Sequence, residues 1–95
     1  MNRAEFIAML EQEGYKEFAT VEREPHNVLG VHTHPFEARA LITLGELRLV
    51  TGEHEQLCRV GDQFHLLAHT PHSESCGAEG VHYLVGRKPG TQSMS

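Results

Sequence analysis

The spacing of hydrophobic residues changes once along this chain, close to Gly14. Before that point, four apolar residues recur at a spacing close to one face of a helix, and they are Phe6, Ile7, Met9 and Leu10. Asn2 can accept the N-cap hydrogen bond, and Glu5 stands three residues later, as in a capping box. The pattern therefore predicts a short helix over about residues 2–13, ended by Gly14.

After Gly14 the chain changes to short runs of β-branched and aliphatic residues separated by turn signals. The predicted strands cover residues 18–23, 28–34, 38–50 with an interruption at Gly45, 55–60, 65–67, 72–76 and 81–86. Thr51-Gly52-Glu53 is a polar hairpin turn between two of them. No helical pattern separates the strands, so we expect an all-β fold, a small antiparallel barrel or jelly roll of about six to eight strands.

Length and charge restrict the class of protein. A chain of 95 residues is expected to form one domain (1–95), with the barrel over about 18–86 and a flexible tail over 87–95. The net charge of −5 comes without a basic stripe, which argues against a nucleic-acid partner. No apolar run is long enough for a signal peptide or a membrane span, so no membrane association is expected. Cys58 and Cys76 are too few for a disulfide framework, which favours the cytoplasm.

Histidine spacing is the strongest chemical signal in the sequence. His32 and His34 share one face of the chain if the segment is extended, because strand side chains alternate between faces. His72 follows a Thr-Pro turn and would bring a third imidazole from a distant strand. These three residues predict a site for a divalent transition metal, and their chemistry suits Zn, Fe, Mn, Ni or Cu alike. Three protein ligands leave coordination positions for water and substrate.

A carboxylate could complete this site. If His72 faces inward, the alternation also turns Glu74 and Cys76 inward. A buried carboxylate must be paired, bound to metal or hydrated, so Glu74 is a candidate metal ligand, pocket acid/base or substrate contact, or exposed charge at the rim. Cys76 is expected to be a small buried hydrophobe.

Two segments resemble the motifs of the cupin superfamily, G-x5-H-x-H-x3,4-E-x6-G and G-x5-P-x-G-x2-H-x3-N. The first motif matches at His32, His34 and Gly45, and the second at Gly61 and His72, with Pro71 inside its frame and with Leu67 and Cys76 at the motif proline and asparagine. The resemblance covers roughly residues 18–86. It implies a cupin barrel with a metal held by the matching histidines.

The sequence departs from the family pattern at several positions. Two motif glycines are replaced by His26 and His69, which we interpret as turn residues rather than ligands. The metal-binding glutamate of the family falls on Ala38, with Glu37 one residue early. A shift by one residue sends a strand side chain to the opposite face, so Glu37 is expected to point outward unless a bulge redirects it. An inward apolar set is expected instead, consisting of Ala38, Ala40, Ile42 and Leu44.

Three functional hypotheses follow. The chain could be a metal-dependent enzyme, of oxygenase or isomerase type, acting on a small molecule. It could instead bind a small ligand or act as a sensor without catalysis, or use the metal only to stabilise the fold, because a fold does not fix a function. Exposed strand edges also predict a homodimer, formed through residues 18–23 or the first helix.

Overall fold

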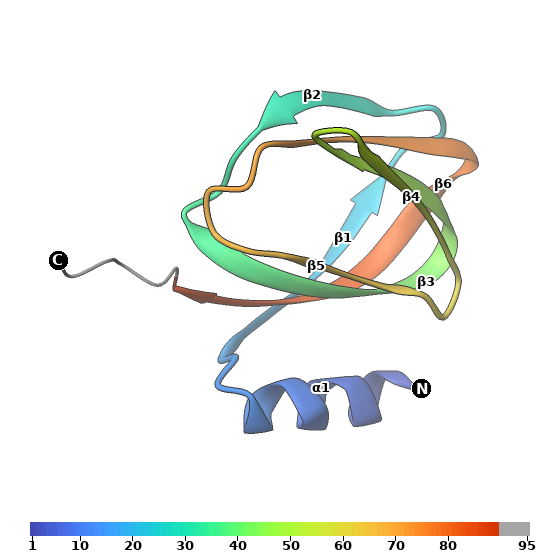
Figure 1. Ribbon diagram of the computed structural model, residues 1–95. Helices are drawn as coiled ribbons and strands as arrows, with labels where there is room; N and C mark the ends of the chain where they lie inside the picture. The colour runs from blue at the N-terminus through green and yellow to red at the C-terminus, as the bar shows by residue number, and fades with distance from the viewer. Residues whose placement is uncertain (90–95) are drawn as a thin grey trace, which may run out of the picture.

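A computed structural model describes residues 1–89 of the chain. It contains α1 (Arg3–Gln12), β1 (Glu17–Arg23), β2 (Val28–His32), β3 (Phe36–Thr51), β4 (His54–Arg59), β5 (Gln63–Leu66) and β6 (His72–Pro89). All six strands belong to one antiparallel sheet that curves into a small barrel, with the helix outside it (Figure 1). The predicted all-β class and the single N-terminal helix are confirmed.

Helix α1 starts as the sequence predicts. The Asn2 side chain accepts from the Glu5 backbone N–H at 2.8 Å, and the Glu5 carboxylate accepts from the Asn2 backbone N–H at 3.0 Å. This reciprocal capping box satisfies two backbone donors at the helix start. The helix then packs on the outer face of the sheet through a small cluster of buried residues, Phe6, Leu10, Tyr15, Leu41 and Leu84.

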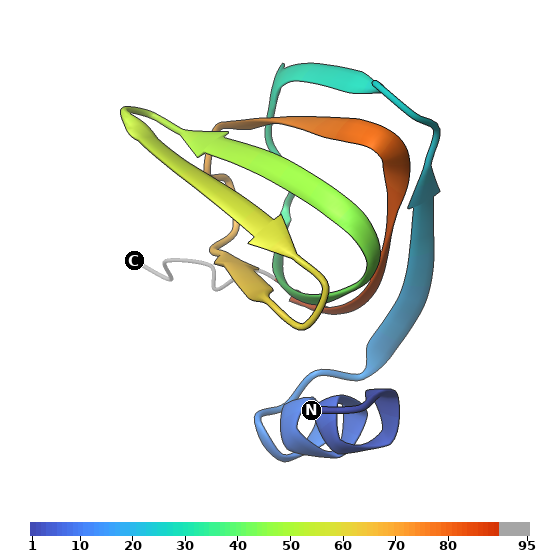
Figure 2. The ribbon, with the colours of Figure 1, turned by 90° about the vertical axis from the view of Figure 1, so that its right-hand side faces the viewer.

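Two long strands organise the barrel. β6 pairs with β1, β2 and β3, while β3 pairs with β4, β5 and β6. Figure 2 shows both strands bending around the same interior. The bend coincides with register shifts between Ile42 and Leu44 and between Gly45 and Leu47. Gly45 has φ 74°, and a Cβ there would collide with the carbonyl oxygen of Gly80, so only glycine fits.

The interior of the barrel is filled by inward side chains of β3, β4, β5 and β6. The main cluster contains Ala38, Ala40, Ile42, Leu47, Leu49, Cys58, Phe64, Leu66, Val81, Tyr83 and Val85. Leu44 was expected to belong to this set and does not, since 41% of its surface is exposed. The register shift after Ile42 reverses the alternation and turns Leu44 outward.

Several predicted strand limits are corrected. β3 continues through Gly45 without a break, and the two strands expected over 72–76 and 81–86 are one strand, β6. β2 ends at His32, two residues earlier than expected. β6 runs on to Pro89 because residues 87–89 still pair with β3, so the predicted flexible tail is wrong over 87–89. Residues 90–95 of that prediction lie outside the described part of the chain.

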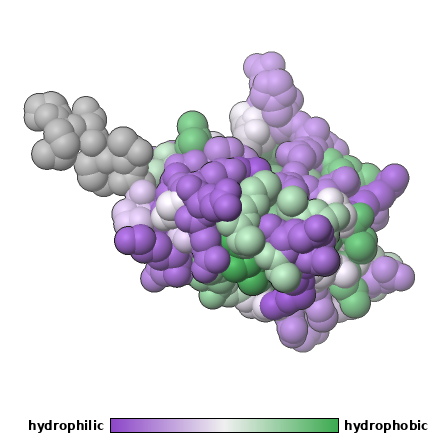
Figure 3. Space-filling model, turned by 90° about the horizontal axis from the view of Figure 1, so that it is seen from below, coloured by the Kyte–Doolittle hydropathy of each residue, from purple (hydrophilic) through white to green (hydrophobic). Residues whose placement is uncertain are grey.

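The outer surface on the side of α1 is mainly hydrophilic, with small apolar areas between the charged and polar side chains (Figure 3). Within residues 1–89, no helix has the length and apolar character needed to cross a membrane.

Candidate metal centre

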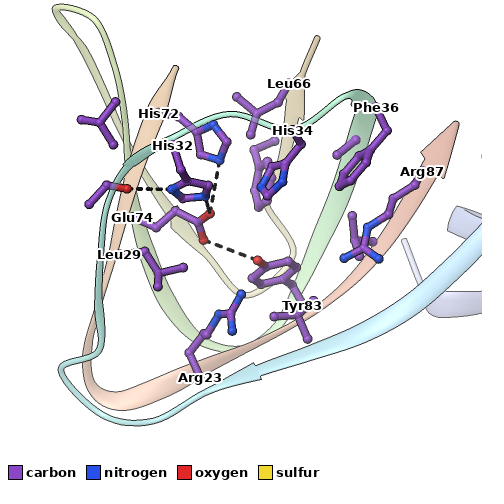
Figure 4. Close-up of a pocket in the computed structure, with 16 residues that line it drawn as sticks. Arg23, Leu29, His32, His34, Phe36, Leu66, His72, Glu74, Tyr83 and Arg87 are labelled. Carbon is purple, nitrogen blue, oxygen red and sulfur yellow. Dashed lines mark hydrogen bonds and ion pairs between the residues drawn. The ribbon is translucent and has the colours of Figure 1, made fainter. Parts of the chain in front are cut away.

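Three histidines from two distant segments meet at one end of the barrel. His32 at the end of β2 lies directly opposite His72 at the start of β6, and His34 follows in the connection to β3. One ring nitrogen from each residue lies within 4.8 Å of the other two. We call His32, His34 and His72 the histidine triad; Figure 4 shows their rings converging on one side of a pocket.

Backbone carbonyls orient two rings of the triad. Nδ1 of His32 lies 2.6 Å from the carbonyl oxygen of Gly30, and Nδ1 of His72 lies 2.9 Å from that of Thr70. A carbonyl oxygen only accepts, so each Nδ1 carries the proton and donates it. In the neutral rings Nε2 is therefore left with a free lone pair facing the pocket, as in metal-ligating histidines.

A backbone hydrogen bond joins the β2–β3 connection to the β5–β6 connection beside the triad. The backbone N–H of His69 donates to the carbonyl oxygen of His34 at 2.7 Å. His69 reaches this position with φ 64°, and His26 likewise has φ 61°. Both residues therefore occupy the left-handed turn conformation that their motif positions predict, and neither belongs to the triad.

Glu74 lies inside the pocket beside the triad. It is 8% exposed, and its Oε2 lies 3.4 Å from His72 Nε2 and 3.7 Å from His32 Nε2. Its Oε1 accepts a hydrogen bond from the Tyr83 hydroxyl at 3.4 Å. The inward direction expected from alternation along β6 is therefore observed.

The donor set fits a cation. His72 is 2% exposed, and its Nε2 is buried without a hydrogen-bond partner. The Nε2 lone pairs of His32 and His72 both lie less than 4 Å from Oε2 of Glu74. Three acceptors this close together repel one another unless a positive charge lies between them. Imidazole nitrogens with a nearby carboxylate are typical ligands of divalent transition metals.

The electrostatics of the pocket favour the neutral form of His34 and the protonated form of Tyr83. Burial lowers the pKa of His34, and the neighbouring rings of His32 and His72 lower it further. A neutral ring is the form that binds a metal. Burial, together with the charge of Glu74, raises the pKa of Tyr83 to about 12, so its hydroxyl remains a hydrogen-bond donor at neutral pH.

The histidine triad opens on a cavity of about 470 Å³. Most of the remaining wall is apolar and includes Leu29, Phe36, Phe64 and Leu66. Arg23 and Arg87 contribute two positive charges to the same wall (Figure 4). A concave, largely apolar pocket with a few convergent polar groups is the usual form of a small-molecule site.

Glu37 lies away from this pocket, on the helix side of the sheet. Its carboxylate accepts from Tyr15 at 3.2 Å and lies 2.5 Å from His65 Nε2. The outward direction expected from the one-residue shift is therefore confirmed, and no bulge brings Glu37 to the triad. His65 is therefore part of an outer network with Glu37 and Tyr15 and is not part of the triad.

Sequence reasoning missed Arg23, Tyr83 and Arg87. The alternation along β6 could have placed Tyr83 and Arg87 on the same face as Val81 and Val85, but Arg87 fell in the expected tail. Cys76 was expected to be buried and is only half-buried, with its Sγ 3.0 Å from the carbonyl oxygen of Glu24.

Comparisons by sequence find no relative: no protein-family model and no curated protein matches this chain. Solved structures do match. An RmlC-like cupin from Shewanella frigidimarina is 17% identical with a TM-score of 0.64, over 74% of this chain and 63% of that one. The cupin domain of Cnp3 from Schizosaccharomyces pombe is 17% identical with a TM-score of 0.69, over 79% and 57%.

A third match is the DMSP lyase DddQ from Ruegeria pomeroyi, 19% identical with a TM-score of 0.70, over 80% of this chain and 39% of that one. This chain therefore spans less than two thirds of each of these three structures. At such low identity the matches concern the fold alone. The barrel, its strand pairing and these matches together show that this chain has the cupin fold.

Proposed function

We propose that the histidine triad binds a divalent transition metal, and that the pocket beside it takes a small-molecule ligand or substrate. The observation that carries this proposal is the pair of oriented rings: Nδ1 of His32 and of His72 donates to the backbone, which turns both Nε2 lone pairs toward Glu74. A bound metal would supply Lewis acidity at the inner end of the pocket.

The role of Glu74 distinguishes a metal-dependent enzyme from a non-enzymatic binding module. It is the only carboxylate lining the pocket among residues 1–89. If Glu74 remains free when metal is bound, it can exchange a proton with a bound molecule, with its position fixed by the Tyr83 hydroxyl, and the protein is a metal-dependent enzyme. This is the function that we propose, of oxygenase or isomerase type.

The second candidate is a non-enzymatic binding or sensor module, and it follows if Glu74 is the fourth metal ligand. Its Oε2 is already close to two of the triad nitrogens. Once it is bound to the metal, the remaining pocket wall contains no free carboxylate, and Tyr83 with its raised pKa is a poor base. The pocket could then hold a ligand but would lack an acid/base group.

We also propose that the protein forms a homodimer in the cytoplasm. Within residues 1–89, β1 pairs only with β6 and its other edge has no strand partner, while Val28 and Val31 on β2 are 71% and 76% exposed. A second copy would cover such an edge. Both cysteines are free, as expected of a reducing compartment.

Metal analysis of protein purified without an affinity tag tests the central proposal. We expect close to one transition-metal ion per chain, removable by a chelator and restored by adding the metal back. A preparation that holds no transition metal, and that binds none when it is offered, would contradict the proposed site.

A further inference from the structure

Two arginines face the pocket from the strands beside Tyr83. Arg23 ends β1, and Arg87 lies near the end of β6, with the tyrosine between them in Figure 4. Both side chains line the same cavity as the histidine triad. Neither residue belongs to the metal site, so their presence on this largely apolar wall needs a separate explanation.

Neither guanidinium group has a carboxylate partner within residues 1–89. Nε of Arg23 and Nε of Arg87 are buried without a hydrogen bond. Among residues 1–89, neither arginine forms an ion pair, although six other basic and histidine side chains outside the pocket each pair with a glutamate. Both arginines are half-buried, and a positive charge partly withdrawn from water is unfavourable without a counter-charge, so an anion is the group that would satisfy both residues.

The pocket itself cannot neutralise them. Glu74 is its only carboxylate in the described chain, and Glu74 already accepts from Tyr83 and lies against His32 and His72. Two guanidinium groups therefore face one carboxylate, in a protein whose net charge is −5. A local positive excess inside an acidic protein attracts an anionic ligand.

Arg87 is also held at a fixed place relative to the metal site. Its guanidinium lies 5.0 Å from the centre of the Phe36 ring, and Phe36 stacks on His34 with ring centres 4.8 Å apart and planes 16° apart. Stacking uses the flat face of a guanidinium and leaves its N–H edge available for a carboxylate. Phe36 therefore separates the cation from the triad by one aromatic ring.

We infer that the pocket binds a small organic carboxylate, with its anionic group at Arg23 and Arg87 and its apolar body against the wall. This inference rests on the proposed function for the other end of the ligand, which would lie at the histidine triad. The cavity of about 470 Å³ limits the ligand to a small molecule. A planar carboxylate matches the paired N–H groups of a guanidinium better than a single point charge would.

Calorimetric titration of the metal-loaded protein with benzoate and benzamide tests the inference, because the two molecules have almost the same shape and differ in charge. We expect benzoate to bind at least about tenfold more tightly than benzamide, as charge-assisted hydrogen bonds predict. Arg23→Gln and Arg87→Gln should each remove most of this preference without changing metal content. Arg48→Gln removes the same charge from an exposed ion pair outside the pocket and should have no effect.

A second measurement avoids the need for variants. In ¹⁵N NMR spectra of the wild-type protein, the Nε–H signals of Arg23 and Arg87 should shift with benzoate and stay in place with benzamide. The inference is overturned if benzoate and benzamide bind equally, if neither benzoate nor acetate, pyruvate or succinate binds at about 10 mM, or if both pocket variants behave like Arg48→Gln. Arginine-dependent benzoate binding by protein that holds no metal would support the anion site while contradicting the proposed metal site.

Discussion

His32 and His72 face each other across the β2–β6 ladder, and each ring donates Nδ1–H to the carbonyl oxygen of the residue two positions before it. The acceptors are Gly30 and Thr70. The same local contact thus fixes two rings that come from segments forty residues apart in the chain. Their Nε2 atoms are directed to a common point before any ligand arrives, which reduces the conformational entropy lost on binding.

Removal of any member of the histidine triad should remove most of the bound metal. In His72→Ala, for example, two imidazoles remain, and these compete poorly with water and buffer for the ion. Elemental analysis of the purified variants, after dialysis against a weak chelator, measures the loss.

His26→Gly and His69→Gly are the matched controls for these variants. Each removes an imidazole at a position with positive φ, where glycine causes no strain. Both should keep their metal. Metal retained in His72→Ala but lost in His69→Gly would show that the site has been placed on the wrong residues.

Glu74→Gln separates the two roles proposed for this residue. The change keeps the size of the side chain and removes its charge. If Glu74 is the fourth ligand, Glu74→Gln should lower metal affinity by about tenfold or more. As an acid/base group, it would leave metal content unchanged and abolish turnover of any substrate that is identified. Competition with a fluorescent chelator gives the first quantity; if neither quantity changes, Glu74 has no role in the site.

Lowering the pH should reduce both the affinity for metal and the free energy of unfolding of the metal-free protein. The pKa of His34 is below 6.5, the value of an unfolded chain, because of burial and then the neighbouring triad rings. Between these two values the unfolded chain binds more protons than the folded one, so the free energy of unfolding falls as pH drops below about 6.5. Urea unfolding at several pH values should show this loss, and His34→Gln should reduce it.

Metal affinity should fall over the same range, because protons compete for the imidazole lone pairs. Retention of metal that is the same at pH 8 and pH 5 would contradict ligation by histidine.

Glu37 should contribute to stability at a more acidic pH. Burial alone would raise its pKa, but hydrogen bonds with His65 and Tyr15 outweigh burial and bring the pKa below 4.5. A carboxyl group with a lowered folded-state pKa stabilises the protein above its unfolded pKa, and this contribution is lost as pH falls through the folded value. Glu37→Gln should flatten the stability profile below about pH 5, measured by urea unfolding, without changing metal content.

Gly45→Ala should destabilise the barrel by about 1–3 kcal/mol or more, because alanine is strained at positive φ and its Cβ meets the Gly80 carbonyl. Thermal unfolding measures the effect. Gly52→Ala is the comparison: it also has positive φ, 61°, but nothing lies within 4 Å of its Cβ position. Equal losses in the two variants would show that the close approach to Gly80 contributes nothing.

Local features of the fold could be predicted because short-range physics determines them. The helix start depends on Asn2 and Glu5, which are three residues apart, and the direction of Glu74 follows from strand alternation. The same alternation placed Glu37 outside. The alternation gave the wrong direction for Leu44, because a register shift between Ile42 and Leu44 reverses it where β3 bends against β6. The residues near Leu44 do not predict this shift, since it depends on pairing with a distant strand.

The sequence by itself determined the fold class, the helix and the identity of the histidine triad, since each depends on period, spacing or turn preference within a short segment. Only the tertiary structure decided that His32 is opposite His72, that Glu37 joins Tyr15 and His65, and that two arginines share the pocket. These relationships join residues far apart in the chain, and their distances depend on strand register and barrel curvature. Both are set by the packing of the whole sheet rather than by any one segment.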